Sequence, residues 1–518
     1  MNTAHSLENK KKGVGTLGEV ATLFVLLFIF LFRFQFDGNE IDVLPYARAF
    51  YKPNWLTADW YLHLHIPYRF LFSYSVGWSI DTFGLVPALV SGRLISYFVF
   101  SWALVRLKKA TLPELPFAVF LIPFSVYLLL FHHGFGAKEW MVGALDTKVF
   151  AYAFVLLSVA FAIQKKHISS LAFAGAALSF HLLIGAYSAF CLLPVFGVQL
   201  YRGETPMKTW VKGTIAFLIA GAIGLYGIVY QLFMVPAYQA DKAWETYVQF
   251  RVPHHLVPSE FPTTWWVFLC FFTLINSVIW RFASKSNLRQ LALYCLMMSL
   301  LCAVGIAVYF WGPVSALRYY FFRLADGFLP LATLIGGVGL VFEKRPQWKN
   351  YMRGRGKLVV LLLVIGVSIS PTYKLFSTAT LSSKTFTSNH PQDWEMVEFV
   401  RARASENNVF CVWPINYYWY VDYERPVFVS YKHAPQNPAD LSEWKKRLVL
   451  LNHGNELRRD GQFRANFTAL NEEDFLNIKK LYPEVTHALL PAEMKLDFPV
   501  LHETEEHVLY ALPILKNE

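Results

Sequence analysis

The first polar segment of the chain, residues 36–67, carries acidic side chains spaced among aromatic ones. Asp37, Asp42 and Asp59 are candidates for catalysis, because a carboxylate can deprotonate an acceptor hydroxyl as a general base. They could also hold a divalent metal that neutralises a phosphate leaving group. Asp37 is the first choice, because it follows a hydrophobic helix, where burial would change its pKa most. The alternative is a solvated loop whose acids only follow membrane topology.

A second polar segment, residues 132–148, carries acidic and basic side chains beside an apolar run. Glu139 and Lys148 are its strongest candidates, the acid for catalysis and the cation for binding an anionic group. The alternative is that these side chains only reach from the membrane interface toward water. The segment's other charged or titratable residues are His132, His133, Lys138 and Asp146.

Three further residues suit phosphate binding in the run RVPHH. Arg251 can pair with phosphate through two parallel N–H groups, and His254 and His255 can donate to phosphate oxygens. They could instead hydrogen-bond to the backbone. A zinc site would need more ligands than these two histidines, and none is spaced nearby, so no metal site is predicted here.

Two arginines near a late apolar span, Arg318 and Arg323, are also predicted to contact phosphate, because ionisable residues at membrane depth often mark a substrate path. The alternative for Arg323 is a structural ion pair with Asp326, three residues later. His181 lies within an apolar stretch and is interpreted as a hydrogen-bonded packing residue.

Composition indicates a membrane protein. The 518 residues are 55% hydrophobic, with a mean hydropathy of +0.35. The formal net charge of +11 does not indicate nucleic-acid binding. The basic residues gather in short loops before residue 384, where the positive-inside rule places them, whereas residues 385–518 are mildly acidic. No CxxC or Cys/His metal spacing occurs.

Hydropathy and basic loops together predict an α-helical polytopic membrane domain over residues 1–384, with about eleven spans. The amino terminus is expected inside and the carboxyl terminus outside, so that the acidic segments face outward. Residues 68–84 are expected to form an interfacial or re-entrant segment. The expected spans are 16–34, 85–105, 114–131, 149–163, two short ones within 168–200, 211–233, 264–280, 290–310, 325–342 and 358–373.

Residues 385–518 are predicted to form an extracytoplasmic α/β domain. Helices are expected at 393–404, 441–451 and 472–481, from their apolar periodicity. Alternation of these helices with β-rich runs favours a layered sheet. The expected strands are 409–414, 425–432, 486–491 and 507–513.

This arrangement resembles the GT-C class of membrane glycosyltransferases. The resemblance rests on the first-loop acids, on Arg323 at a late span, and on the sequence after residue 135. That sequence is a G-x-x-E…T-K-x-x-A-Y run formed by Gly136, Glu139, Thr147, Lys148, Ala151 and Tyr152. The RVPHH run, together with Ala58-Asp59-Trp60, is similar to an uncharacterised bacterial group of this class. The first loop has no D-x-D pair, and the tail has no W-W-D-Y-G sequence like that of oligosaccharyltransferases.

The resemblance implies a hexosyl- or pentosyltransferase in the bacterial inner membrane. It would move a sugar from a polyprenyl-phosphate donor to a glycan, lipid or protein acceptor on the outer face. A first-loop Asp would act as base, external cations would stabilise the leaving phosphate, and the tail would help to recognise the acceptor. Two other functions stay open: a polymerase or ligase of lipid-linked glycans, and a non-catalytic transporter or assembly protein.

Overall fold

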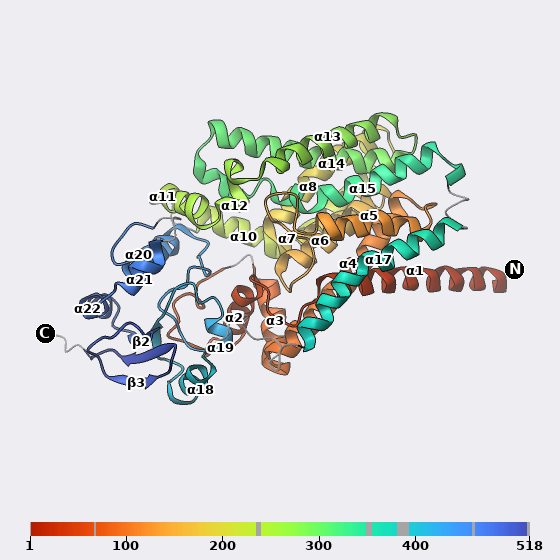
Figure 1. The fold of residues 1–518 in the computed structure, drawn as a ribbon. Coiled ribbons are helices and arrows are strands. Elements are labelled where there is room, and N and C mark those ends of the chain that lie inside the picture. The colour runs from red at the N-terminus through yellow and green to blue at the C-terminus, as the bar shows by residue number, and fades with distance from the viewer. Residues whose placement is uncertain are drawn as a thin grey trace.

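The computed structural model describes residues 2–66, 69–234, 240–348, 355–380, 393–457 and 462–514. A long body of helices is followed by a tail that carries the sheet, at the end of the molecule far from the amino terminus (Figure 1). The predicted boundary at residue 384 lies outside the described residues.

Apolar runs form helices wherever the sequence predicts spans. The helices of the body are α1 (Asn2–Leu31), α2 (Glu40–Tyr51), α3 (Phe70–Phe83), α4 (Leu85–Thr111), α5 (Phe117–Leu130), α6 (Thr147–Ile163), α7 (His167–Phe180), α8 (Leu182–Tyr201), α9 (Met207–Ala220), α10 (Ala222–Phe233), α11 (Ala240–Glu245), α12 (Pro253–Leu256), α13 (Thr263–Phe282), α14 (Ser286–Trp311), α15 (Arg323–Lys344) and α17 (Arg355–Thr380). Single helical turns at Thr246–Arg251, Pro258–Glu260 and Val314–Tyr319 join some of them.

Six of the described helices are long and apolar enough to cross a membrane, or seven if the bent pair α9–α10 counts as one span. Such a set of helices is that of a multi-pass membrane protein. The number is smaller than the eleven predicted. Most of the difference lies in four apolar helices of 10–17 residues, Gly15–Leu31, α5, α6 and α7, which at about 1.5 Å per residue are shorter than a bilayer core of about 30 Å.

The pair α9–α10 bends by 68°, between Ala220 and Ala222. On the neighbouring helix α7, a Cβ at Gly175 would lie 2.4 Å from the Phe217 carbonyl oxygen. Glycine is therefore needed at this helix crossing, because a side chain would collide with backbone. The bend turns α10 toward the end of the body where the acidic loops lie.

The first acidic loop is more ordered than a solvated loop. Residues 40–51 form α2, and residues 70–83 form α3, which packs against α2 and α4. With 14 residues α3 is about 21 Å long, too short to span a bilayer. This agrees with the prediction that residues 68–84 are not a full span.

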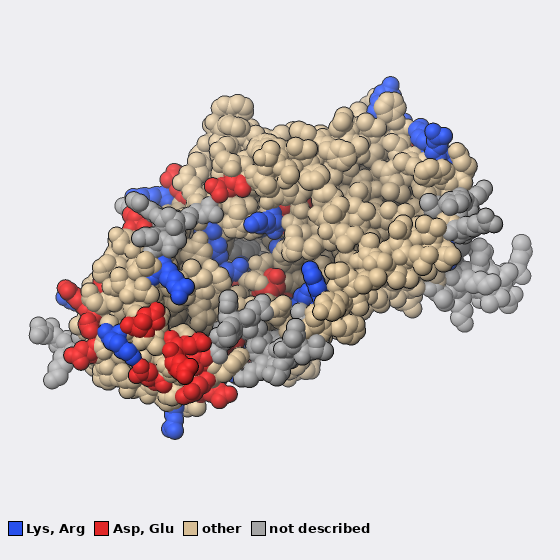
Figure 2. All heavy atoms as spheres, in the orientation of Figure 1, with Lys and Arg blue, Asp and Glu red and all other residues tan. Residues whose placement is uncertain are grey.

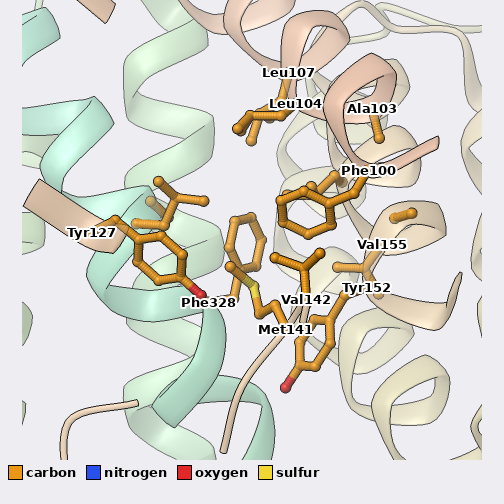
Figure 3. Close-up of a cluster of buried hydrophobic side chains, with 14 of the residues drawn as sticks. Phe100, Ala103, Leu104, Leu107, Tyr127, Met141, Val142, Tyr152, Val155 and Phe328 are labelled. Carbon is orange, nitrogen blue, oxygen red and sulfur yellow. The ribbon is translucent and has the colours of Figure 1, made fainter. Parts of the chain in front are cut away.

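The second acidic loop, residues 131–146, is fixed by apolar side chains (Figure 3). Met141 and Val142 are buried among Phe100 of α4, Tyr152 of α6 and Phe328 of α15. Because a close-packed core tolerates little displacement, this anchoring also fixes the polar residues on either side of it, Glu139 and Lys148.

The tail forms a four-stranded sheet with strand order β1-β2-β4-β3. β1 and β2 are parallel, whereas β2–β4 and β4–β3 are antiparallel. Helices lie beside this sheet, as the alternation of elements predicts. The tail elements are α18 (Trp394–Arg403), β1 (Val409–Cys411), α19 (Trp419–Asp422), α20 (Pro438–Leu451), α21 (Gln462–Thr468), α22 (Glu472–Leu481), β2 (Val485–Pro491), β3 (Val500–Glu503) and β4 (His507–Ala511).

One predicted strand of the tail is wrong and another was missed. Residues 425–432 make a single parallel bridge, Phe410 to Val427, instead of a strand. Pro426 has no N–H to donate to a ladder, and after Phe428 the chain turns to bond Pro414. Strand β3 lies within a charged stretch, where no apolar pattern predicts it.

Candidate active site

A cavity of about 430 Å³ lies where the acidic loops, α8, α10 and the tail meet. Its wall carries four cations, two carboxylates and a histidine, and a hollow with Lys and Arg side chains around it is visible between the body and the tail (Figure 2). We call it the cationic cavity. Its charged or titratable wall residues are Arg69, Lys148, Arg318, Arg323, Asp42, Asp146 and His181.

The structure brings together residues from four distant parts of the sequence. Asp42 comes from the first loop, Lys148 from the start of α6, and Arg318 and Arg323 from the segment before α15 and its first turn. All four were predicted from sequence. Gln436 and Pro438 show that the tail completes the cavity.

Arg323 is held in place by a buried acid. Its Nε donates to Glu139 Oε1 at 2.8 Å, and its Nη1 lies 3.2 Å from His181 Nε2. Because a guanidinium can only donate, His181 accepts this bond as a neutral imidazole. The side chain of Arg323 is 15% exposed, so it reaches the cavity with its remaining N–H groups.

Glu139 lies behind the cavity wall and is only 1% exposed. Besides Arg323, it faces Lys148 Nζ at 3.5 Å and His255 Nδ1 at 3.8 Å. Burial would raise the pKa of Glu139, but Arg323, Lys148 and His255 hold it well below its usual range. Glu139 is therefore an ionised group that orients cations around the cavity.

The alternative ion pair of Arg323 with Asp326 is wrong. Asp326 is completely buried and accepts backbone N–H bonds from Phe135, Ala137 and Glu139, at 3.0 to 3.2 Å. This carboxylate fixes the turn that carries Glu139. A carboxylate surrounded by three backbone donors has no need of an arginine partner.

Arg318 has no carboxylate within 4.0 Å among the described residues. Its guanidinium lies 4.8 Å from the ring centres of Trp244 and Tyr319. Aromatic faces hold a cation without neutralising its formal charge. Arg318 is therefore positioned in the cavity wall with charge available to an anion.

The three first-loop acids have different surroundings. Asp42 accepts a hydrogen bond of 2.6 Å from the Tyr61 hydroxyl and pairs with Arg69 at 3.4 Å. Burial would raise the pKa of Asp42, but nearby Arg69 and His433 and the Tyr61 bond lower it. Such a carboxylate is ionised, but both of its oxygens already contact protein groups.

Asp59 lies at neither cavity. It is 1% exposed and accepts from the Tyr420 hydroxyl and from the backbone N–H groups of Leu62 and Val427. Burial raises the pKa of this carboxyl, although these donors oppose the shift. Its contacts join the first loop to the tail.

Asp37 faces a second cavity of about 350 Å³. Its Oδ1 accepts the Asn39 N–H at 2.9 Å, while no described residue donates to its Oδ2. One oxygen of Asp37 is thus free for a substrate. The two cavities adjoin at the turn from Asp37 to Asn39, because Asn39 lines the cationic one.

The RVPHH residues line neither cavity. Arg251 donates to the Lys432 carbonyl at 2.9 Å and lies over the Tyr431 ring. His255 donates from Nδ1 to the Ala137 carbonyl at 2.5 Å, and burial lowers its pKa to about 3. His254 neighbours His255, with their ring centres 4.1 Å apart. These residues connect the body, the second loop and the tail.

Sequence reasoning gave several wall residues no role in the site. Asp146 precedes α6 and accepts from Asn39 at 3.0 Å and from Thr147 at 2.9 Å; its place just before Thr147 and Lys148 was the available signal. His181 lies at the break between α7 and α8 rather than in packed helix. Nothing in the sequence singles out Arg69 or Gln436.

The chemistry of this wall suits a phosphate group. Its cations can bind phosphate oxygens and stabilise charge that develops on a leaving phosphate. Among the described residues no group of three His, Cys, Asp or Glu side chains could hold a metal ion.

Comparison with known proteins gives fold-level similarity alone. No protein-family model matches the chain, and no curated protein matches it. It is similar to the archaeal oligosaccharyltransferase AglB from Archaeoglobus fulgidus, solved with an inhibitory peptide and a dolichol-phosphate, with 11% identity, a TM-score of 0.49, and coverage of 93% of this chain and 70% of that one. The apo crystal structure of the A. fulgidus oligosaccharyltransferase gives the same identity and TM-score, over 92% and 70%. Similarity this low carries no functional assignment, which therefore depends on the cavity.

Proposed function

We propose that this protein is a membrane glycosyltransferase that moves a sugar from a polyprenyl-phosphate donor to an acceptor at the extracytoplasmic face. The observation that carries the proposal is the cationic cavity, where uncompensated positive charge meets apolar wall residues. Leu182, Leu183 and Leu232 line it beside the cations. A lipid phosphate has this same combination of a charged head and an apolar chain.

The donor phosphate is bound by Arg318, Arg323 and Lys148. Arg318 has no carboxylate partner, and Arg323 keeps N–H groups free beyond its bond to Glu139. The apolar chain leaves along α10, whose Leu232 is 64% exposed on the surface of the body. An exposed apolar helix face is what lipid covers in a membrane protein.

Asp37 is the general base in this scheme. Asp42 is already bonded to Tyr61 and paired with Arg69, and Asp59 is enclosed, whereas Asp37 has a free oxygen next to the donor cavity. It takes the proton of the acceptor hydroxyl while the oxygen bonds to the sugar carbon. The bond from that carbon to the phosphate oxygen breaks, and the polyprenyl phosphate leaves with the negative charge.

The positions of the basic loops support the proposed membrane orientation. Lys285 pairs with Glu114 at 3.4 Å, and the Ser284 N–H bonds Glu343, so three cytoplasm-assigned loops meet at one end of the body. The positive-inside rule then places the tail and both cavities outside. A reporter fused after Lys109 should be cytoplasmic and one at residue 518 extracytoplasmic. A cytoplasmic carboxyl terminus would contradict the scheme.

The base assignment is tested by Asp37→Asn in purified protein with defined polyprenyl-phosphate sugars. Loss of one general base should lower the transfer rate by about 10²- to 10⁴-fold. Asp81→Asn is the matched control, since Asp81 is exposed on α3 and contacts Lys52; it should transfer normally. Normal transfer by Asp37→Asn with loss in Asp42→Asn would move the role to Asp42, and absence of transfer from every donor would reject the function.

A further inference from the structure

The second cavity is distinct from the cavity assigned to the donor. It is enclosed by the end of α1, the turn at Asp37, the second loop, and Tyr418 from the tail. Its volume of about 350 Å³ is within the range of small-molecule sites, about 300–1,000 Å³. The tail therefore reaches both cavities, through Tyr418 here and Gln436 in the cationic cavity.

The two cavities adjoin in two places. In the first loop, Asp37 and Gly38 line the second cavity while Asn39 lines the cationic one. In the second loop, Trp140 lines the second cavity, and Lys148 of the cationic cavity lies 3.7 Å from its ring centre. Ligands in the two cavities would thus be neighbours at the turn that carries Asp37.

The lining of the second cavity combines aromatic rings with unused polar groups. Trp140 and Tyr418 supply ring surface, and Arg33 adds a cation. The side chains of Gln35, His133 and Tyr418 have no hydrogen-bond partner among the described residues, so their polar groups are available. Saccharides present apolar C–H faces and many hydroxyls, which match ring faces and free donors respectively.

We infer that the second cavity binds the acceptor and that this acceptor is a carbohydrate, with its reacting hydroxyl at Asp37. The inference rests on the proposed function, because it assigns the second substrate of the same reaction. The hydroxyl gives its proton to Asp37 Oδ2, and its oxygen forms the bond to the sugar carbon of a donor held in the cationic cavity. The donor's phosphate leaves, so a glycosidic bond replaces the sugar–phosphate bond.

Binding to the full-length protein in lipid nanodiscs tests this inference, with two probes measured separately. The first is a panel of methyl glycosides of glucose, galactose, mannose and N-acetylglucosamine, followed by saturation-transfer NMR. The second is farnesyl phosphate, for the cationic cavity. At least one glycoside should bind, and Tyr418→Ala and His133→Ala should weaken it about tenfold or more. Tyr418→Phe keeps the ring and should retain most binding.

Arg318→Ala is the matched control from the other cavity. It should weaken farnesyl phosphate and leave glycoside binding unchanged. Absence of binding by all four glycosides, or glycoside binding that Tyr418→Ala and His133→Ala leave intact, would overturn the carbohydrate assignment. Binding of a serine-containing peptide in their place, sensitive to Tyr418→Ala, would also overturn it. If glycosides bind and farnesyl phosphate does not, the result counts against the proposed donor site instead.

Discussion

Two arginine–glutamate pairs in this protein have the same chemistry and different surroundings. In the first, Arg93 and Glu40 are 3% and 0% exposed. Arg93 Nε donates to Glu40 Oε1 at 2.7 Å, its Nη2 contacts the second carboxylate oxygen, and it also donates to the Arg33 and Gln35 carbonyls. The carboxylate of Glu40 further accepts the N–H groups of Asp37 and Leu145.

The second pair, Arg323 with Glu139, is incomplete by comparison. Arg323 is 15% exposed and donates one bond to Glu139, with His181 as its other polar side-chain partner. Arg323 lines the cationic cavity. An arginine with most of its five N–H groups bonded to protein mainly holds structure, whereas one with more unbonded N–H groups can also bind a ligand.

The more fully bonded pair, Arg93 with Glu40, still serves the site. Glu40 bonds the backbone of Asp37 in the first loop and of Leu145 in the second. These two loops line both cavities. The Arg93–Glu40 pair thus holds the two loops together, while the Arg323–Glu139 pair presents a cation to the cationic cavity.

Arg93→Met should cause the largest loss of stability. It leaves Glu40 charged and buried without its partner, which costs about 3–5 kcal/mol in the free energy of unfolding. Thermal unfolding in a fixed detergent measures it. Arg323→Met should cost less, because Glu139 keeps the Lys148 ammonium at 3.5 Å. Equal destabilisation by the two variants would remove the distinction between the pairs.

Arg323→Lys should have an intermediate effect, and on transfer rather than folding. Lysine keeps the charge but lacks the planar fork that can bond Glu139 and phosphate together. Losing one charge-assisted hydrogen bond of about 1.5–3 kcal/mol predicts a roughly 10- to 100-fold slower transfer. Arg281→Lys, on the opposite end of the body, is a control that should transfer normally. An Arg323→Lys enzyme with full activity would assign Arg323 a purely structural role.

The smallest effect is on the pH dependence of stability, through His255, which lies beside Glu139 of the second pair. Burial lowers the pKa of His255 to about 3, against about 6.5 in an unfolded chain. Between about pH 6.5 and pH 3 the unfolded state binds more protons at this ring than the folded state does. The contribution of His255 to the free energy of unfolding is therefore complete above about pH 6.5 and declines as the pH falls toward 3. His255→Asn should flatten the decline by about 1–2 kcal/mol between pH 7 and 5. Chemical denaturation at several pH values measures this decline. If the unfolding free energy falls as steeply with pH in the variant as in the original protein, the burial of this ring is contradicted.

Much of the architecture could be predicted, because long apolar runs and basic loops are local signals. Every predicted span coincides with one or more helices, and three helices of the tail begin and end near their predicted residues. Their lengths were harder to infer: α5, α6 and α7 are too short for the count of eleven. Whether a short apolar helix crosses a membrane depends on its neighbours rather than on its own sequence.

The residue types of the site were predictable, but their arrangement was not. Lys148, Arg318 and Arg323 line one cavity together with Asp42, and the three cations are the groups that can bind phosphate oxygens. The sequence offered Asp326 as an alternative, structural partner of Arg323, because i,i+3 neighbours share a helix face. Glu139 is that partner instead, 184 positions away along the chain.

The sequence by itself determined that this is a helical membrane protein with acids and cations in its polar segments, since hydropathy and charge are properties of each segment alone. Only the tertiary structure decided which of those groups have all their hydrogen bonds made within the protein and which keep an unbonded atom. Asp59 was enclosed by Tyr420 and Val427 of the tail, while Asp37 kept one oxygen unbonded. Hydrogen-bond saturation depends on partners that are distant in sequence, and packing alone brings them within reach.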